Sequence, residues 1–158
     1  MEWYGRGPGE NYIDRCTGSF VGKYTSKVRD LFVDYARPQD NGCRTDVRWV
    51  AFTDSEGRGI RVVQSEPLVF QAMEYDWEDL YLSRHRNGER RRRAPLVSQG
   101  ANLVNLDIRQ TGLGGASCGP GPMDAYRFDL SKEVEWTLVI EPQGQATEHG
   151  KVVKSGKY

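Results

Sequence analysis

Short stretches of alternating apolar and polar residues run along the chain with the period of half-buried β-strands. The alternation is clear in residues 19–24 (SFVGKY) and 31–37 (LFVDYAR). Two further runs within residues 45–66 flank the sequence DSEGRG, residues 54–59, whose glycines can adopt a positive φ in a tight turn. This segment is the clearest predicted hairpin.

A second hairpin is predicted in residues 126–142, because strand-like runs flank the polar pair Ser131 and Lys132. One short helix is predicted in residues 74–85, where Trp77, Leu80 and Tyr81 follow helical spacing. The pattern as a whole therefore predicts strands joined by turns, with little helix.

Composition supports the same class of fold. The length of 158 residues predicts one domain. Glycine is frequent, at 18 residues, and aromatic and β-branched residues recur in short runs, which favours an all-β domain. The 22 basic side chains balance the 22 acidic ones, so no net field attracts nucleic acid or an anionic membrane. We expect neither partner.

No targeting signal identifies a compartment. The N-terminal residues lack a signal-peptide pattern, and no apolar window is long enough to span a bilayer. The basic run at residues 84–95 (RHRNGERRRRAP) has no interleaved aromatic residues, so a solvated loop is favoured over a nucleic-acid arm. Residues 1–142 are predicted to form the domain, and residues 143–158 a flexible polar tail.

The residues with reactive side chains predict no catalytic or metal site. Cys16, Cys43 and Cys118 show no metal-ligand spacing and are interpreted as buried or unreactive thiols. The two histidines, His85 and His149, have no partner at the spacing of metal ligands or of a general base. Both are interpreted as ordinary polar residues.

A glycine cluster follows a predicted strand at residues 105–122, as in phosphate-binding turns of nucleotide-binding folds. Such a site needs a helix to start at the glycines, but Pro120 and Pro122 prevent a regular helix there. Residues 112–122 are therefore predicted to form a long irregular loop between strands.

The segment GPGENYIDR, residues 7–15, is consistent with an active-site loop or a structural corner. Its initial Gly-Pro-Gly fixes a bend, and Asn11 and Asp14 are residue types that bond neighbouring backbone in turns. Glu10 and Arg15 are close enough in sequence to form an ion pair around the bend. A pair of acids can catalyse glycoside hydrolysis, but sequence separation alone does not establish the geometry. We interpret the segment as a structural corner.

Three segments together resemble one known family. They are WYGRGPGENYIDR (residues 3–15), YARPQDNGCRTDVRWVAF (35–52) and NLDIRQTGLGGASCGPGP (105–122). Their sequences, order and approximate spacing are similar to the C-terminal small-chain domain of glycoside hydrolase family 2 β-galactosidases, over about residues 2–142. The resemblance implies an antiparallel β-sandwich of the galactose mutarotase-like type, within an enzyme that hydrolyses terminal β-galactosides with retention.

The resemblance also implies that catalysis belongs to another domain. In that family, two catalytic glutamates lie in a separate (β/α)8 barrel, and such a barrel takes on the order of 250 residues. We therefore expect no catalytic residue, metal ion or cofactor in this chain, although the whole enzymes often use Mg and Na. The implied partners are the remaining domains, including the barrel, and the galactoside is contacted indirectly.

The chain departs from the family pattern in two places. Met1 stands directly before the first motif, where the family has further strands, so an incomplete sandwich and self-association through exposed sheet are expected. In many relatives the loop after the Gly114-Gly115 pair carries a tryptophan that contacts the sugar, and Cys118 stands at or beside that position. We predict that Gly114, Gly115, Ser117 and Cys118 line the substrate entrance, while direct sugar contact by Cys118 stays open.

Two functions of different classes follow. The first is a non-catalytic accessory domain that supports the barrel and shapes the entrance to its site. The second is a stand-alone carbohydrate-binding module that uses exposed aromatic residues such as Trp3, Trp77 or Trp136. The module predicts an aromatic platform in a groove, whereas the accessory domain predicts buried tryptophans and an exposed apolar face.

Overall fold

The computed structural model describes residues 1–35, 40–82, 96–113, 119, 121–129 and 131–144. These residues form one six-stranded antiparallel sheet with three short helical segments. The strands are β1 (Glu2–Gly7), β2 (Phe20–Thr25), β3 (Arg44–Thr53), β4 (Gly59–Met73), β5 (Leu103–Asp107) and β6 (Leu138–Gln143). The helical segments are the 3-10 helices η1 (Val28–Leu31) and η2 (Asp124–Tyr126) and the α-helix α1 (Trp77–Leu82).

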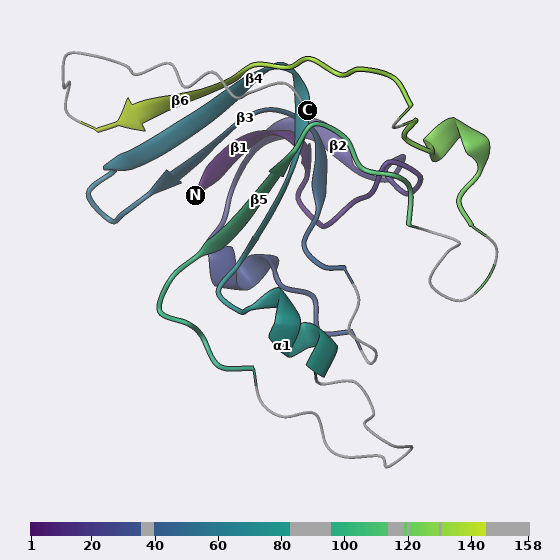
Figure 1. Ribbon diagram of the computed structural model, residues 1–158. Helices are drawn as coiled ribbons and strands as arrows, with labels where there is room; N and C mark the ends of the chain where they lie inside the picture. The colour runs from purple at the N-terminus through teal and green to yellow at the C-terminus, as the bar shows by residue number, and fades with distance from the viewer. Residues whose placement is uncertain (36–39, 83–95, 114–118, 120, 130, 145–158) are drawn as a thin grey trace.

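The long strand β4 organises the sheet. The strands lie in the order β2-β1-β3-β4-β5, and β6 also pairs with β4. β6 pairs with residues 59–64 of β4, whereas β5 pairs with residues 69–73 (Figure 1). Because β3 occupies the other edge, β5 and β6 share one edge of β4 and leave a gap between them. This antiparallel, all-β arrangement matches the predicted β-sandwich class.

The hairpin between β3 and β4 confirms the clearest sequence prediction. The Asp54 carboxylate accepts hydrogen bonds from the backbone N–H groups of Glu56 and Arg58, at 2.8 and 2.9 Å. The Arg58 guanidinium forms an ion pair with the same carboxylate, with an N–O distance of 3.0 Å, and Gly57 has a φ of 78°. Local turn chemistry and the freedom of one glycine therefore close this hairpin.

One face of the sheet carries the main hydrophobic core. Trp3, Val50 and Val62 are neighbours across β1, β3 and β4, and each is at most 1% exposed. Phe70 meets the Trp3 ring edge-on at a centroid distance of 5.9 Å, and Leu31 from η1 belongs to the same cluster. Full burial of an aliphatic or Phe side chain contributes roughly 1.5–3 kcal/mol. This cluster therefore binds the central strands and η1 into one unit.

The opposite face of the sheet carries a row of aromatic and aliphatic side chains. Successive neighbours across β1, β3, β4 and β6 are Tyr4, Trp49, Val63 and Val139. The guanidinium of Arg48 lies 5.6 Å from the centre of the Tyr4 ring, and that of Arg61 lies 4.6 Å from the centre of the Trp49 ring. These cation–π contacts cover part of the row, so its aromatic rings are only partly accessible.

Two predictions of local structure are wrong. Residues 31–35 do not form a strand, because Val28 and Leu31 both pack into the core from one turn of 3-10 helix. Residues 126–129 do not form the first strand of the second predicted hairpin, because the long edge of β4 takes β6 as its partner.

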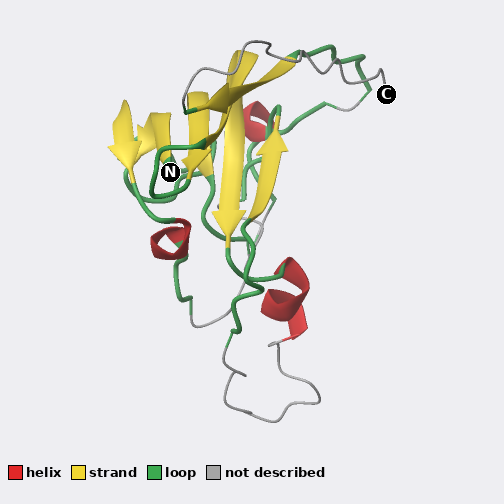
Figure 2. Ribbon diagram, turned by 90° about the vertical axis from the view of Figure 1, so that its left-hand side faces the viewer, coloured by secondary structure: helices red, strands yellow, loops and turns green. Residues whose placement is uncertain are grey.

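The predicted short helix is confirmed as α1, beyond the end of the sheet in Figure 2, and its Leu80 is 2% exposed. No helix in the described part of the chain is long and apolar enough to cross a membrane. The predicted basic loop at residues 84–95 and nearly all of the predicted tail lie outside the described residues.

Candidate functional site

The predicted entrance residues Gly114, Gly115, Ser117 and Cys118 lie outside the described residues, so their role stays a prediction. The structure does describe both ends of their loop and the corner that holds it. The candidate site is therefore the junction between the corner, residues 7–15, and the base of the loop, residues 110–113.

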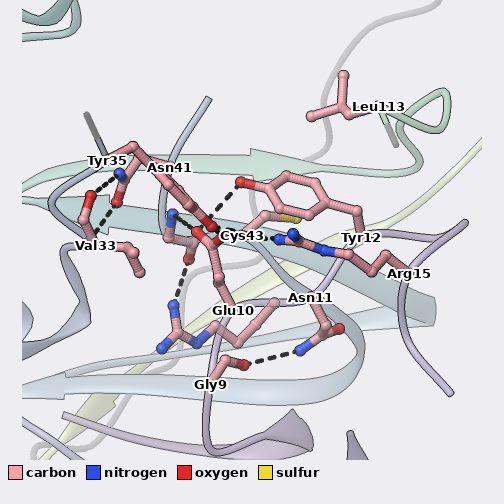
Figure 3. A network of polar contacts seen from close by, with 12 residues as sticks. Gly9, Glu10, Asn11, Tyr12, Arg15, Val33, Tyr35, Asn41, Cys43 and Leu113 are labelled. Atoms are coloured by element: carbon pink, nitrogen blue, oxygen red, sulfur yellow. Dashed lines mark hydrogen bonds and ion pairs between the residues drawn. The ribbon is translucent and has the colours of Figure 1, made fainter. Parts of the chain in front are cut away.

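A buried carboxylate organises the corner. The Glu10 side chain is 7% exposed, and both of its oxygens accept hydrogen bonds (Figure 3). Oε1 accepts from Arg15 at 2.8 Å and from the Tyr35 hydroxyl. Oε2 accepts from the backbone N–H of Gly42 at 2.9 Å and from the Tyr12 hydroxyl at 3.4 Å. The predicted ion pair with Arg15 is confirmed, whereas Tyr35 and Gly42 lie too far away in sequence for any local pattern to indicate them.

Two more buried polar side chains attach the corner to β3. The Asn11 side chain donates to the carbonyl of Gly9 at 3.1 Å, which confirms its predicted local bond. Its Oδ1 also accepts from the N–H and the hydroxyl of Thr45, at 3.1 and 2.6 Å. Arg44 donates to the carbonyl of Pro8 at 3.0 Å. Buried and partnered polar groups of this kind fix one arrangement of the backbone.

The corner also holds the base of the loop. Asp14 accepts a hydrogen bond from the N–H of Leu113, 99 positions along the chain, at 3.2 Å. Gly112 lies so close that a Cβ there would stand 2.6 Å from a carboxylate oxygen of Asp14. Leu113 packs against the small cluster that contains Tyr12 and Val69. Corner and loop base are therefore in direct contact.

Hydrogen bonds close the neck of the loop. The N–H of Gly112 donates to the carbonyl of Tyr126 at 2.7 Å, and the N–H of Phe128 donates to the Thr111 hydroxyl at 3.2 Å. These two bonds bring the described residues before and after the loop together. The described residues within 112–122 form no helix or strand, as predicted.

Burial makes two titratable side chains beside the junction, Tyr12 and Cys43, less reactive. Burial, followed by the charge of Glu10, raises the pKa of the Tyr12 hydroxyl far above its ordinary value. Burial also raises the pKa of the Cys43 thiol, and the charge of Asp40 adds to the effect. The thiol donates to the side-chain oxygen of Gln110 at 3.4 Å. Both groups stay protonated near neutral pH and serve as hydrogen-bond donors, not as nucleophiles.

The hydrogen-bond partners of Glu10 give this carboxylate a structural role. Each oxygen of Glu10 already accepts two hydrogen bonds from the protein, whereas a general base or nucleophile must face the substrate. The described ranges contain no group of three or more His, Cys, Asp or Glu side chains placed to hold a metal ion. The arrangement instead holds the base of the loop, Gly112 and Leu113, against the corner.

The tryptophans form no exposed platform. Trp3 is 1% exposed and donates from its indole to the carbonyl of Arg6 at 3.0 Å. Trp49, Trp77 and Trp136 are half-buried. A large apolar side chain is exposed instead at Phe20, which is 76% exposed on the edge strand β2. The tryptophan-based binding module is therefore not favoured.

Fold and junction together define a domain of the β-sandwich class in which the base of one loop is held by a polar corner. Comparison with known protein families identifies the family of this chain. It belongs to the β-galactosidase small chain family, whose model matches residues 1–140. The family resemblance found in the three sequence segments is thereby confirmed.

Individual relatives agree with this placement. The chain is 33% identical over 142 residues to a β-galactosidase of Halalkalibacterium halodurans, covering 89% of the chain and 13% of that protein. It is 33% identical over 115 residues to a β-galactosidase of Priestia megaterium, covering 73% and 10%. A β-galactosidase of Kluyveromyces lactis is 32% identical over 143 residues, covering 89% and 13%. The chain thus spans only 10–13% of the length of these relatives.

Proposed function

We propose that the chain acts as a non-catalytic accessory domain of a β-galactosidase, where it supports the catalytic barrel and shapes the active-site entrance. The observation that carries the proposal is the match of 89% of this chain to 13% of a β-galactosidase. The chain is shorter than the roughly 250 residues of a (β/α)8 barrel. Retaining hydrolysis of terminal β-galactosides by a pair of glutamates then belongs to the whole enzyme.

The junction supports the proposed role at the entrance. Asp14 and the neck hydrogen bonds fix both ends of the loop that carries Gly114, Gly115, Ser117 and Cys118. A loop held at both ends loses little further conformational entropy when a substrate arrives. The held ends support a role of this loop at the entrance, where the proposal has the galactoside meet it beside the barrel.

The proposed partners are the remaining domains of the enzyme. The edge strand β2 exposes Phe20 and Val21, by 76% and 39%. An unpaired edge with exposed apolar residues favours contact with another protein surface. We expect this edge to meet a neighbouring domain, or a second copy of the chain when that domain is absent. The proposal assigns the Mg and Na that the whole enzymes often use to these other domains.

A domain exchange tests the proposal. The matching segment of the Halalkalibacterium halodurans relative is replaced by this chain, and hydrolysis of nitrophenyl β-galactoside is compared with that of a variant lacking the segment. We expect the exchange to restore most of the activity that the deletion removes. An unrelated β-sandwich of equal length is the matched control, and we expect it to restore none. Equal activity of the exchange and the deletion would contradict the proposal, as would turnover by the isolated chain.

A further inference from the structure

The dipeptide Asn41-Gly42, beside the corner, has a chemical reactivity that its structural contacts do not require. Asparagine is one of the thermolabile residue types. In an Asn-Gly pair, the backbone nitrogen of the glycine can attack the side-chain carbon Cγ of the asparagine, because glycine has no side chain to hinder the approach. The pair is therefore a candidate site of deamidation.

The reaction needs only the chain itself and water. The Gly42 nitrogen forms a bond to Cγ of Asn41, the Cγ–Nδ2 bond breaks, and the backbone proton leaves with the amide group as ammonia. Water then opens the resulting succinimide ring at either of its carbonyl carbons, which leaves aspartate or isoaspartate. The main chain is longer by a methylene group in isoaspartate. No group is oxidised or reduced.

In the folded chain, other segments hold both reacting groups. Asn41 is 2% exposed. Its Nδ2 donates to the carbonyl of Val33 at 2.6 Å, and its Oδ1 accepts from the Val33 N–H at 2.9 Å (Figure 3). The Gly42 N–H donates to Oε2 of Glu10 at 2.9 Å. The reaction therefore requires these hydrogen bonds to break and water to reach a buried side chain.

The backbone on both sides of the pair is also fixed. Nε2 of Gln71 donates to Oδ1 of Asp40 at 2.5 Å and to the carbonyl of Asn41 at 3.4 Å. The Arg44 guanidinium donates to the carbonyl of Gly42 at 2.8 Å. Attack depends on bringing nitrogen and carbon into a near-attack arrangement. These contacts restrict the rotations that would bring the two atoms into that arrangement.

The products of the reaction do not fit the closed corner. An aspartate in place of Asn41 has no N–H to donate to the Val33 carbonyl, and it adds a buried negative charge. Burial, and to a smaller degree the charge of Glu10, raises the pKa of the neighbouring Asp40, so this environment already disfavours a further carboxylate. The longer main chain of isoaspartate displaces the Gly42 N–H from Glu10.

We propose that Asn41-Gly42 is a latent deamidation site that the closed corner protects. Local opening breaks the contacts with Glu10 and Val33 and exposes the pair to attack. Conversion to aspartate or isoaspartate then prevents the corner from closing again, so that opening becomes irreversible. The proposal goes beyond the accessory role and does not rest on it, because every contact involved belongs to this chain.

The test compares conversion at Asn41 in the folded and the unfolded 158-residue chain. Samples are kept at about pH 8 with and without guanidinium chloride, and peptide mass spectrometry with enzymatic isoaspartate labelling follows both products over time. We expect conversion on the order of 100-fold slower in the folded chain, because buried contacts open rarely. Equal rates in the two samples, or no conversion at Asn41 in the unfolded chain, would overturn the proposal.

Two variants separate local opening from global unfolding. Glu10→Ala removes the acceptor of the Gly42 N–H, so we expect conversion at Asn41 in the folded chain to rise about tenfold or more. Leu68→Ala is the matched control, because it weakens the main core and leaves the corner contacts in place. Denaturant adjusts both variants to the same unfolded fraction.

The two variants give three outcomes. Faster conversion in Glu10→Ala than in Leu68→Ala supports protection by the corner. Equal acceleration would show that only global unfolding exposes the pair, and would overturn the proposal. Slower conversion in Glu10→Ala than in wild type would show that the carboxylate assists the attack as a base, and would also overturn it.

A third variant tests the consequence of conversion. Asn41→Asp reproduces one product, and we expect a lower urea midpoint than in wild type and faster hydrogen exchange of the Gly42 amide. Asn102→Asp changes an exposed asparagine and is the control, with little expected effect on either quantity. An Asn41→Asp chain as stable as wild type would show that the product fits the closed corner, which would overturn the proposed irreversibility.

Discussion

The corner, residues 7–15, and a cleft beside the middle of β4, between β5 and β6, both contain several charged side chains, but these side chains have different surroundings. In the corner, the Glu10 carboxylate is 7% exposed and accepts four hydrogen bonds from the protein. The cleft is lined by Glu66, Arg109 and Glu133, whose side chains have no hydrogen-bond or ion-pair partner in the described part of the chain. A fully partnered polar group stabilises one structure, whereas an unpartnered group keeps its capacity for a ligand. Sequence composition alone does not separate these two cases.

The largest expected effect comes from removing the centre of the corner. Glu10→Ala leaves the Gly42 N–H and the Tyr12 hydroxyl without their acceptor, so we expect the free energy of unfolding to fall by about 3 kcal/mol. Urea denaturation measures the change. Glu56→Ala, at an exposed ion pair on the β3–β4 turn, is the control and should leave the midpoint nearly unchanged. Equal midpoints for the two variants would contradict the difference between corner and surface.

A smaller effect is expected at the contact between corner and loop. Gly112→Ala places a Cβ 2.6 Å from an Asp14 oxygen, so the carboxylate must move away from Leu113. We expect a loss of about 1–2 kcal/mol and faster hydrogen exchange of the Leu113 amide.

Combining Gly112→Ala with Asp14→Ala tests the cause. The double variant removes the atoms that clash, so its loss should be smaller than the sum of the two single losses. Strict additivity would show that the two residues do not interact.

The stability of the protein at alkaline pH should report on the buried Tyr12 hydroxyl of the corner. Burial raises the pKa of Tyr12 above its ordinary value of 10.0, so the folded state holds this proton more strongly than the unfolded state does. Its contribution to stability is therefore present below pH 10 and declines as the pH rises further. We expect Tyr12→Phe to reduce the slope of stability against pH above 10.

Part of this alkaline slope should persist in Tyr12→Phe. Burial also raises the pKa of Tyr35 and, from its ordinary value of 9.0, that of the Cys43 thiol. Urea midpoints between pH 8 and 11 measure the slope. An identical slope in wild type and Tyr12→Phe would show that Tyr12 ionises as easily when folded as when unfolded.

The smallest expected effect on stability is in the cleft. Arg109 is exposed and has no ionic partner among the described residues, so Arg109→Gln should change the free energy of unfolding by less than about 0.5 kcal/mol. A loss similar to that of Glu10→Ala would mean that the cleft arginine is structural. Thermal denaturation of both variants in one buffer gives the comparison.

Sequence patterns predicted the elements that depend on near neighbours. The 54–59 turn closes through Asp54, Glu56, Gly57 and Arg58, which lie within five residues of one another. Residues 31–35 were predicted as a strand, because their alternation does not show that Val28 and Leu31 turn together into the core. The strand prediction failed there because tertiary packing overrode a short local pattern.

The sequence by itself determined the all-β class, the family, the main hairpin and the ion pair of Glu10 with Arg15. Each of these depends on residue types at short spacing or on motifs that can be recognised in the sequence without a structure. Only the tertiary structure decided that Glu10 also meets Tyr35 and Gly42, that Asp14 holds Leu113, and that β5 and β6 share one edge of β4. Such contacts join residues tens of positions apart, and strand register, which depends on the packed core as a whole, brings them together.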